Sequence, residues 1–297
     1  MIDFFILSSP RSGSTFLRLN LDKLKVVTTL PETHFFGFYD RYKKIDLREE
    51  EHRTEAIEEW INWYKVKRLK INRQDLKKNL SDHVSGWKDI LDLTIQFYLN
   101  DRGINREGIL IGEKSSNHIF HQDHIKKFYP DAKIIYLVRD PRAIVASLKG
   151  CAWSTSNVVT NARVWRNGVR EIDSMKPNFV IQYEKMIRTP EETMEKLSNF
   201  LNIEYVEDIF ETKTEDKIEE ESITSKNSLK PPSKEHINKW KNILSRTDRD
   251  IEIIEYICKE EMKNYGYKFE GGSYDFRFYS TLITQSMASY LAKFGKN

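Results

Sequence analysis

Residues 4–15 read Phe-Phe-Ile-Leu-Ser-Ser-Pro-Arg-Ser-Gly-Ser-Thr, and this stretch decides the fold. The apolar run at residues 4–7 has the length of a buried strand, and it stops at a Ser-Ser-Pro turn. From Phe16 to Leu24, apolar residues recur at helical spacing. The stretch therefore predicts a strand, a loop and a helix, an arrangement in which backbone N–H groups and the helix dipole converge on an anion.

The loop after this strand has the spacing of a nucleotide-binding phosphate loop but differs from it at two positions. The pattern G-x-x-x-x-G-K-[ST] requires Gly and Lys where this chain has Ser8 and Ser14, whereas Gly13 and Thr15 match. The cation of this loop is Arg11. A kinase needs the missing Lys and Mg²⁺ on the transferring phosphoryl group, so a metal-dependent kinase is disfavoured. Sulfonyl transfer involves less negative charge and needs only a few hydrogen-bond donors and one or two cations.

Composition excludes several other classes of protein. The chain has 297 residues, with 48 basic and 45 acidic side chains that are interleaved along most of its length, so we expect no nucleic acid polymer as partner. Cys151 and Cys258 have neither disulfide nor metal-site spacing. No stretch has the features of a signal peptide or the roughly 20 apolar residues of a membrane span. We therefore expect a cytoplasmic protein without a transmembrane segment.

Further strands and helices alternate along the chain. Residues 109–111, 133–138 and 179–181 are short apolar runs, and the segments between them have helical patterns, including residues 117–128. The sequence therefore predicts an α/β fold: a P-loop-like three-layer domain with a central parallel sheet of at least four strands flanked by helices.

The outer parts of the chain predict helical additions to this core. We expect one α/β domain over residues 1–270, in which residues 41–101 form a charged helical insertion. Residues 211–232 are polar and end in Pro-Pro, which indicates a long surface loop. Residues 271–297 form an extension whose amphipathic helix, residues 276–294, can dock on the body, on a second subunit in a homodimer or on a membrane surface.

A second motif supports the first. Residues 134–147 read IIYLVRDPRAIVAS, which predicts a strand that ends at Arg139 and a helix that carries Ser147 and is capped by Asp140. Together with PRSGST at residues 10–15, this motif resembles the PAPS-dependent sulfotransferase family. In that family the first loop holds the 5′-phosphosulfate of 3′-phosphoadenylyl sulfate (PAPS), and the second motif holds its 3′-phosphate, for which the Arg fork is suited. The resemblance implies that the donor is bound by Arg11, Ser12, Gly13, Ser14, Thr15, Arg139 and Ser147.

The resemblance is closest to the pattern of protein-tyrosine sulfotransferases. Their catalytic Glu stands in a Glu-Thr-Arg context, and Glu32-Thr33-His34 lies at the same interval from the first loop. The resemblance also matches Lys114 and Lys230 to lysines that would stabilise charge on the bridging oxygen and the phosphate, and Tyr183 to a Tyr-Glu pair near the donor. Cys151 stands where the pattern has a further Arg.

The general base that deprotonates the acceptor remains open between two residues. Glu32 is preferred on its spacing, and His34 is the alternative because an imidazole suits neutral pH. His34 replaces an Arg that would help to position a peptide acceptor, and residues 41–101 show no match to the family. The acceptor class therefore stays undefined.

The sequence thus predicts an enzyme that moves a sulfonate from PAPS to a hydroxyl on a carbohydrate, small metabolite, natural-product intermediate or peptide tyrosine. The alternative is an inactive nucleotide-binding or scaffold protein of the same fold. A metal site is not expected. His118, His121 and His124 recur at every third residue, but such a run drifts around a helix and has no carboxylate clamp.

Overall fold

Five parallel strands form the centre of the molecule. A computed structural model of the chain describes residues 1–207, 209–210, 232–244 and 249–294. The strand order is β2-β3-β1-β4-β5. The strands are β1 (Phe4–Ser8), β2 (Val27–Leu30), β3 (Leu110–Glu113), β4 (Lys133–Val138) and β5 (Phe179–Gln182). The parallel sheet and four of its strands are confirmed, and the edge strand β2 is an addition.

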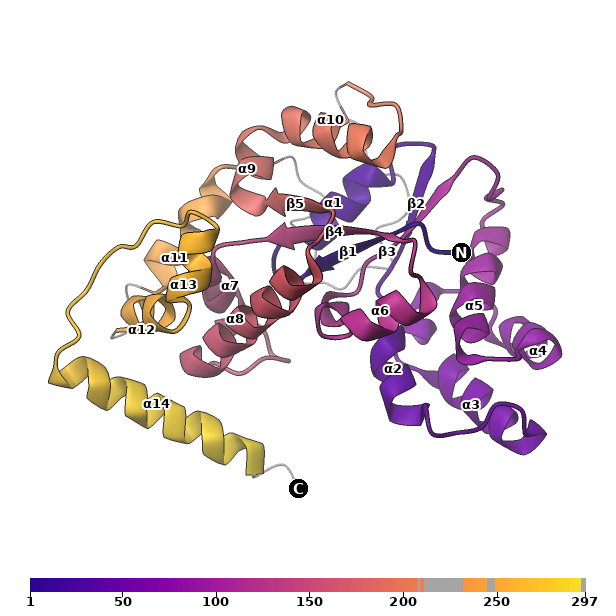
Figure 1. Ribbon diagram of the computed structural model, residues 1–297, viewed down its shortest axis with the longest axis horizontal. Coiled ribbons are helices and arrows are strands. Elements are labelled where there is room, and N and C mark those ends of the chain that lie inside the picture. The colour runs from indigo at the N-terminus through magenta and orange to yellow at the C-terminus, as the bar shows by residue number, and fades with distance from the viewer. Residues whose placement is uncertain (208, 211–231, 245–248, 295–297) are drawn as a thin grey trace.

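The central strand β1 explains why helices cover both faces of this sheet. Its first four side chains, at residues 4–7, are all fully buried and alternate between the two faces. Phe4 and Ile6 belong to one apolar cluster and Phe5 and Leu7 to another. The first cluster is completed by α1 (Ser14–Leu21), α9 (Tyr183–Arg188) and α10 (Pro190–Leu201). The second is completed in part by α7 (Pro141–Lys149) and α8 (Val158–Met175), so three layers result (Figure 1).

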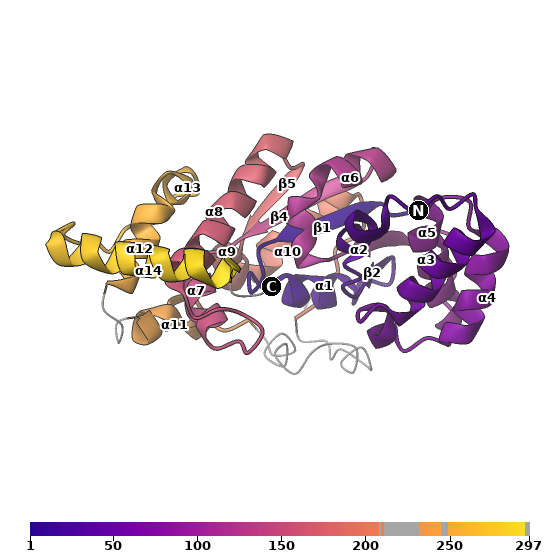
Figure 2. The ribbon, with the colours of Figure 1, turned by 90° about the horizontal axis from the view of Figure 1, so that it is seen from below.

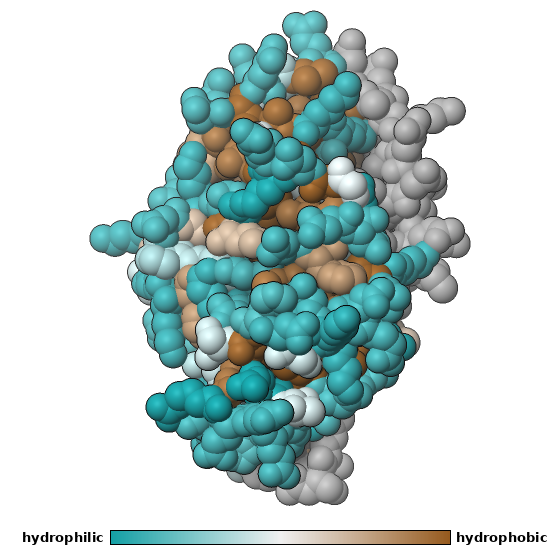
Figure 3. Space-filling model, turned by 90° about the vertical axis from the view of Figure 1, so that its right-hand side faces the viewer, coloured by the Kyte–Doolittle hydropathy of each residue, from teal (hydrophilic) through white to brown (hydrophobic). Residues whose placement is uncertain are grey.

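Residues 41–101 are mostly helical and lie beside one edge of the sheet (Figure 1). They begin in the last turn of α2 (Phe35–Tyr42) and contain α3 (Glu50–Asn62), η1 (Val66–Leu69), α4 (Arg73–His83) and α5 (Trp87–Asp101). Trp60 anchors this part because it is fully buried and its Nε1 donates to Thr94 Oγ1 at 2.9 Å. The outer surface is mostly hydrophilic (Figure 3), in keeping with the charged sequence.

The helix expected at residues 117–128 is interrupted. A 3₁₀ turn, η2 (Ser116–Phe120), precedes α6 (Gln122–Phe128), and the two are separated at His121. His121 has φ −126° and ψ 36°, which is not helical backbone. The interruption separates the three histidines of this segment, because His118 is on η2 whereas His124 is on α6.

The carboxy-terminal part of the described chain is helical. It comprises α11 (Glu235–Leu244), α12 (Asp250–Ile257), α13 (Lys259–Asn264) and α14 (Phe276–Phe294). Helix α14 contacts the body through buried Phe278 and through Asn157 Nδ2, which donates to the carbonyl of Gln285 at 2.9 Å. Ile283, Met287 and Leu291 remain about 60% exposed, so only one side of α14 is docked (Figure 2).

Most of the loop expected at residues 211–232, including Lys230, lies outside the described residues. Among the helices that the structure does describe, none has the length and apolar character required to cross a membrane.

Candidate active site

A cavity of about 840 Å³ opens at the carboxyl ends of the strands. In a parallel sheet these ends lie along one edge, where ligands of open α/β sheets bind. Each strand is followed within a few residues by a side chain that lines the cavity. In the order β1 to β5, these residues are Arg11, Glu32, Lys114, Arg139 and Tyr183. The topology therefore brings together five of the residues predicted from sequence.

The first loop is shaped by a glycine that no other residue can replace without strain. Gly13 caps α1 with φ 92°, and a Cβ there would lie 2.6 Å from the ring of Tyr183. Arg11 also has a positive φ, of 69°. Ser14 and Thr15 line the cavity at the amino terminus of α1, where backbone N–H groups lack helical partners. Ser12 does not line the cavity; its side chain is fully buried.

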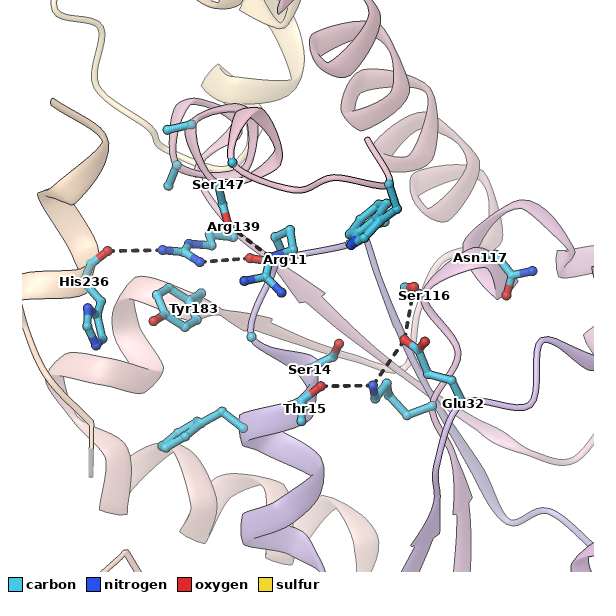
Figure 4. A pocket seen from close by; sticks show the side chains of 18 of the residues that line it. Arg11, Ser14, Thr15, Glu32, Ser116, Asn117, Arg139, Ser147, Tyr183 and His236 are labelled. Carbon is cyan, nitrogen blue, oxygen red and sulfur yellow. Dashed lines mark hydrogen bonds and ion pairs between the residues drawn. The ribbon is translucent and has the colours of Figure 1, made fainter. Parts of the chain in front are cut away.

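The two predicted donor motifs are joined directly. Arg11 Nε donates to Ser147 Oγ at 3.0 Å, although the residues are 136 positions apart (Figure 4). The guanidinium of Arg139 donates to the carbonyl of Arg11 at 2.9 Å and to that of His236 at 3.1 Å. It also lies 4.1 Å from the centre of the Tyr183 ring. These contacts make one cationic wall from segments that are distant in sequence.

The helix after β4 begins as predicted. Asp140 caps α7, since its carboxylate accepts from the backbone N–H of Arg142 at 2.9 Å, and Pro141 occupies the first turn. The indole Nε1 of Trp165 donates to the carbonyl of Arg139 at 3.0 Å. The backbone at Arg139 is therefore held by the hydrogen bond from Trp165 and by the helix cap at the next residue, Asp140.

Glu32 is the centre of the opposite wall. Its Oε1 accepts from Lys114 Nζ at 3.3 Å and from Ser116 Oγ at 3.2 Å. Its Oε2 accepts from Lys65 Nζ at 2.5 Å and lies 3.2 Å from His34 Nε2. Lys114 also donates to Thr15 Oγ1 at 3.1 Å, so this lysine connects the carboxylate with the first loop.

These contacts determine which groups are ionised. Burial raises the pKa of Glu32. The charge of Lys114, the hydrogen bond with His34 and the charge of Lys65 together outweigh this effect and hold the pKa well below its ordinary value. Burial lowers the pKa of His34, and Lys65 adds to this effect, whereas the contact with Glu32 opposes it. Glu32 is therefore a carboxylate and His34 a neutral imidazole at neutral pH.

The backbone that presents Glu32 and His34 is held by a buried hydrogen-bond network. His34 has φ 53°, a left-handed conformation that needs support from its surroundings. Ser115 Oγ accepts from the backbone N–H groups of Thr33 and His34, both at 3.1 Å. Ser115 Oγ and Thr33 Oγ1 in turn donate to Glu113 Oε1, at 2.6 and 2.9 Å.

His118 completes this network from the other side of Glu113. Both side chains are fully buried, and His118 Nδ1 lies 2.9 Å from Glu113 Oε2. The backbone N–H of Phe36 donates to His118 Nε2 at 3.4 Å, so the ring proton belongs on Nδ1, from which it is donated to Glu113. His118 thus has a structural role beneath the cavity.

Several residues of the site were not predicted from the sequence. Tyr64, Lys65 and Arg68 come from the 41–101 segment, which carries no recognisable motif, and all three line the cavity. Tyr64 OH lies 2.6 Å from His34 Nδ1. His236, from α11, also lines the cavity and lies between two sequence pairs that match the family pattern, Lys230-Pro231 and Lys239-Trp240.

Comparison with known proteins agrees with this geometry. A model of the sulfotransferase family matches residues 3–208. Two curated sequences named "Putative protein-tyrosine sulfotransferase", from Caenorhabditis briggsae and Caenorhabditis elegans, are each 28% identical over 91 residues, which is 27% of this chain. The match spans only about a third of either relative, 32% and 35% of their lengths.

Solved structures share the fold across most of the chain. The sulfotransferase domain of the Synechococcus PCC 7002 olefin synthase has a TM-score of 0.66 at 20% identity, with 91% of this chain and 96% of that domain covered. The sulfotransferase domain of the curacin biosynthetic pathway has a TM-score of 0.62 at 19% identity, with 90% and 98% covered. At this level of identity the likeness concerns the fold alone. The family match over residues 3–208 is the decisive comparison, and the chain therefore belongs to the sulfotransferase family.

Proposed function

We propose that this sulfotransferase takes its sulfonate from PAPS and transfers it to a hydroxyl acceptor. The observation that carries the proposal is the direct contact between the two donor motifs, Arg11 Nε to Ser147 Oγ at 3.0 Å, on one wall of a cavity whose other wall holds Glu32. This places phosphate-binding groups opposite a candidate base. A sulfonyl group bound between the two walls would face both the phosphate-binding groups and the candidate base.

The cationic wall fits the two phosphate groups of such a donor. The missing Cβ of Gly13 allows the Tyr183 ring to pack against the first loop, and the backbone N–H groups at the amino terminus of α1 would bind one phosphate. Arg139 has a buried Nε without a hydrogen-bond partner among the described residues. That orphaned donor and the hydroxyl of Ser147 would bind the 3′-phosphate, for which a guanidinium fork is well shaped.

Lys114 would act at the leaving group. In the transfer, the acceptor oxygen forms a bond to sulfur while the bond between sulfur and the bridging oxygen breaks, and the electron pair remains on the 5′-phosphate of adenosine 3′,5′-bisphosphate. Lys114 Nζ, already 3.1 Å from Thr15 Oγ1 in the first loop, would neutralise the charge that develops there. The proton of the acceptor hydroxyl goes to a base on the opposite wall.

Glu32 is the base that we favour. Its pKa is low in the structure partly because Lys114 contacts it, so movement of Lys114 towards the bridging oxygen would raise the pKa of Glu32 when a proton has to be accepted. His34 is the alternative, since it is neutral at neutral pH and lies beside Glu32. Either residue would give the proton to solvent after product release.

The acceptor is a hydroxyl on a carbohydrate, small metabolite, natural-product intermediate or peptide tyrosine. Tyr64, Lys65 and Arg68 supply the cavity wall next to Glu32 and His34. Because these three residues belong to the helical segment that lacks family motifs, the choice of acceptor would be made there. Phe120 and Trp153 add apolar surface at the cavity, and both are exposed.

Isothermal titration calorimetry with adenosine 3′,5′-bisphosphate in the presence of EDTA tests the donor assignment. We expect binding at one site without Mg²⁺. A purified, folded protein that does not bind the nucleotide would overturn the proposal. Incubation with radiolabelled PAPS and panels of the four acceptor classes then identifies the acceptor, with Glu32→Gln as the matched control.

A further inference from the structure

A second cluster of ionisable side chains lies outside the cavity, between α2 and α6. Asp40 belongs to the last turn of α2, His121 caps α6 and His124 is in its first turn. His121 Nδ1 lies 3.0 Å from Asp40 Oδ2, and His124 Nε2 lies 2.8 Å from Asp40 Oδ1. None of the three residues lines the cavity, so the cluster is separate from the proposed reaction.

The fold brings a distant carboxylate to two of the three histidines in this segment. The sequence predicts three histidines that drift around one helix without a carboxylate clamp. The break at His121 removes His118 from the set and directs it to Glu113, whereas His121 and His124 both turn to Asp40, more than 80 residues away in the sequence. Folding therefore supplies a carboxylate, that of Asp40, which contacts both histidines.

We propose that Asp40, His121 and His124 form a binding site for a zinc ion. Two imidazole nitrogens and one carboxylate oxygen are a ligand set that zinc accepts, with water as the fourth ligand. The three ligand atoms lie within 4.8 Å of one another. Tetrahedral zinc with bonds of about 2.0 Å holds its ligand atoms about 3.3 Å apart, so small side-chain rotations are sufficient.

Aromatic packing holds the two imidazole rings in place. His121 and His124 are stacked, with 5.7 Å between ring centres and 16° between planes. The ring of His124 also lies edge-on to Tyr39 at 5.0 Å and near Phe36 at 5.9 Å. Rings that are oriented before the ion arrives lose little side-chain freedom when they bind it.

In the structure the carboxylate of Asp40 is bound to the ammonium group of Lys43. Lys43 Nζ donates to Asp40 Oδ1 at 2.7 Å, and its side chain is 43% exposed. An exposed ion pair of this kind contributes little to stability. A divalent ion coordinated by two additional nitrogens would displace the ammonium, which can return to water without being buried.

The bound ion would connect two elements that lead into the active site. Helix α2 begins at Phe35, the residue after His34, and α6 follows η2, whose first residue, Ser116, donates to Glu32. Zinc between α2 and α6 would therefore stabilise the positions of the two segments that carry His34 and Ser116. It would have no part in sulfonate transfer.

Zinc titration of the untagged full chain, stripped of metal with a chelator, tests the site. With a chromophoric zinc indicator as competitor, we expect one equivalent to bind, and saturating Zn²⁺ to raise the thermal midpoint by roughly 5 °C or more. Asp40→Asn and His124→Gln should each weaken binding at least about tenfold, because loss of an outer-shell partner alone costs about 10–100-fold. His83→Gln, on an exposed histidine of α4, is the matched control and should bind like the wild type.

The same titration contains the results that would overturn the site. The site would be overturned if the metal-free wild type bound no zinc. It would also be overturned if both variants bound one equivalent with the affinity of the wild type. Cobalt provides a second measurement on the wild type, independent of whether the variants fold. Visible bands of a tetrahedral centre without a thiolate charge-transfer band support the site, whereas a thiolate band would assign the ion to Cys151 or Cys258 instead.

Discussion

Lys114 Nζ lies 3.3 Å from Glu32 Oε1, so the cation proposed for the leaving group is bound in the free protein to the carboxylate proposed as base. Lys114 is almost fully buried, with 2% of its side chain exposed. A buried ammonium needs a charged partner, and Glu32 provides one until the donor enters. Binding of the donor would therefore change the electrostatic surroundings of both catalytic candidates at once.

Lys114→Met tests the role of this lysine. We expect turnover to fall by about 10²–10³-fold, as for loss of one group that stabilises developing charge. Affinity for adenosine 3′,5′-bisphosphate should change much less, because Arg11 and Arg139 remain. Single-turnover assays and calorimetry separate the two effects. Lys67→Met, at an exposed position of η1, is the control; equal losses in both variants would contradict a specific role.

The pH dependence of Lys65→Met tests whether the base lies in the cluster of Glu32 and His34 beside Lys65. Lys65 lowers the pKa of Glu32, so its removal should raise that pKa. A base must be deprotonated, and activity is lost as the pH falls through its pKa. The acidic limb of kcat/KM should therefore move to higher pH in this variant. Lys65 lowers the pKa of His34 as well, so the shift is expected for either candidate, and an acidic limb that does not move would exclude both as the titrating group.

Glu32→Gln and His34→Gln divide the base role between the two candidates. If Glu32 accepts the proton, Glu32→Gln should keep its donor affinity and lose about 10²–10⁴-fold in turnover, while His34→Gln retains most of its activity. Calorimetry measures the donor affinity, and initial rates with radiolabelled donor measure turnover. A fully active Glu32→Gln would transfer the role to His34.

Arg139→Ala should weaken donor binding about tenfold to a hundredfold, since hydrogen bonds to a charged group contribute about 1.5–3 kcal/mol. The contacts with the carbonyls of Arg11 and His236 are lost as well, so circular dichroism has to establish that the fold remains. Arg163→Ala, at an exposed position on α8, is the matched control. Unchanged affinity in the Arg139 variant would make the second motif purely structural.

Gly13→Ala and Gly108→Ala separate backbone strain from steric conflict. Both glycines have positive φ, of 92° and 73°, but a Cβ meets the Tyr183 ring at 2.6 Å only at Gly13. We expect Gly13→Ala to lose roughly 1–3 kcal/mol more in free energy of unfolding, because the ring has to move. Urea denaturation measures the difference. Equal losses of unfolding free energy in the two variants would show that the Tyr183 ring moves aside without a cost in stability.

The sequence determined the parts of the fold that depend on neighbouring residues. The apolar run at residues 4–7 with its loop, and the helix capped by Asp140, follow from local hydrophobicity, turn residues and capping. The parallel sheet followed from the alternation of strands and helices. Edge strand β2, Val-Thr-Thr-Leu, was missed because four residues beside a proline give too short a pattern.

Only the tertiary structure decided which side chains meet. The contacts of Lys65 with Glu32, of Arg11 with Ser147 and of Asp40 with His124 join segments 33, 136 and 84 residues apart. Such pairs depend on how helices pack and where a chain reverses, and these are set by burial of the whole core. Residue types and local spacing name the chemical groups; packing around the parallel sheet sets their distances and, through burial, their charges.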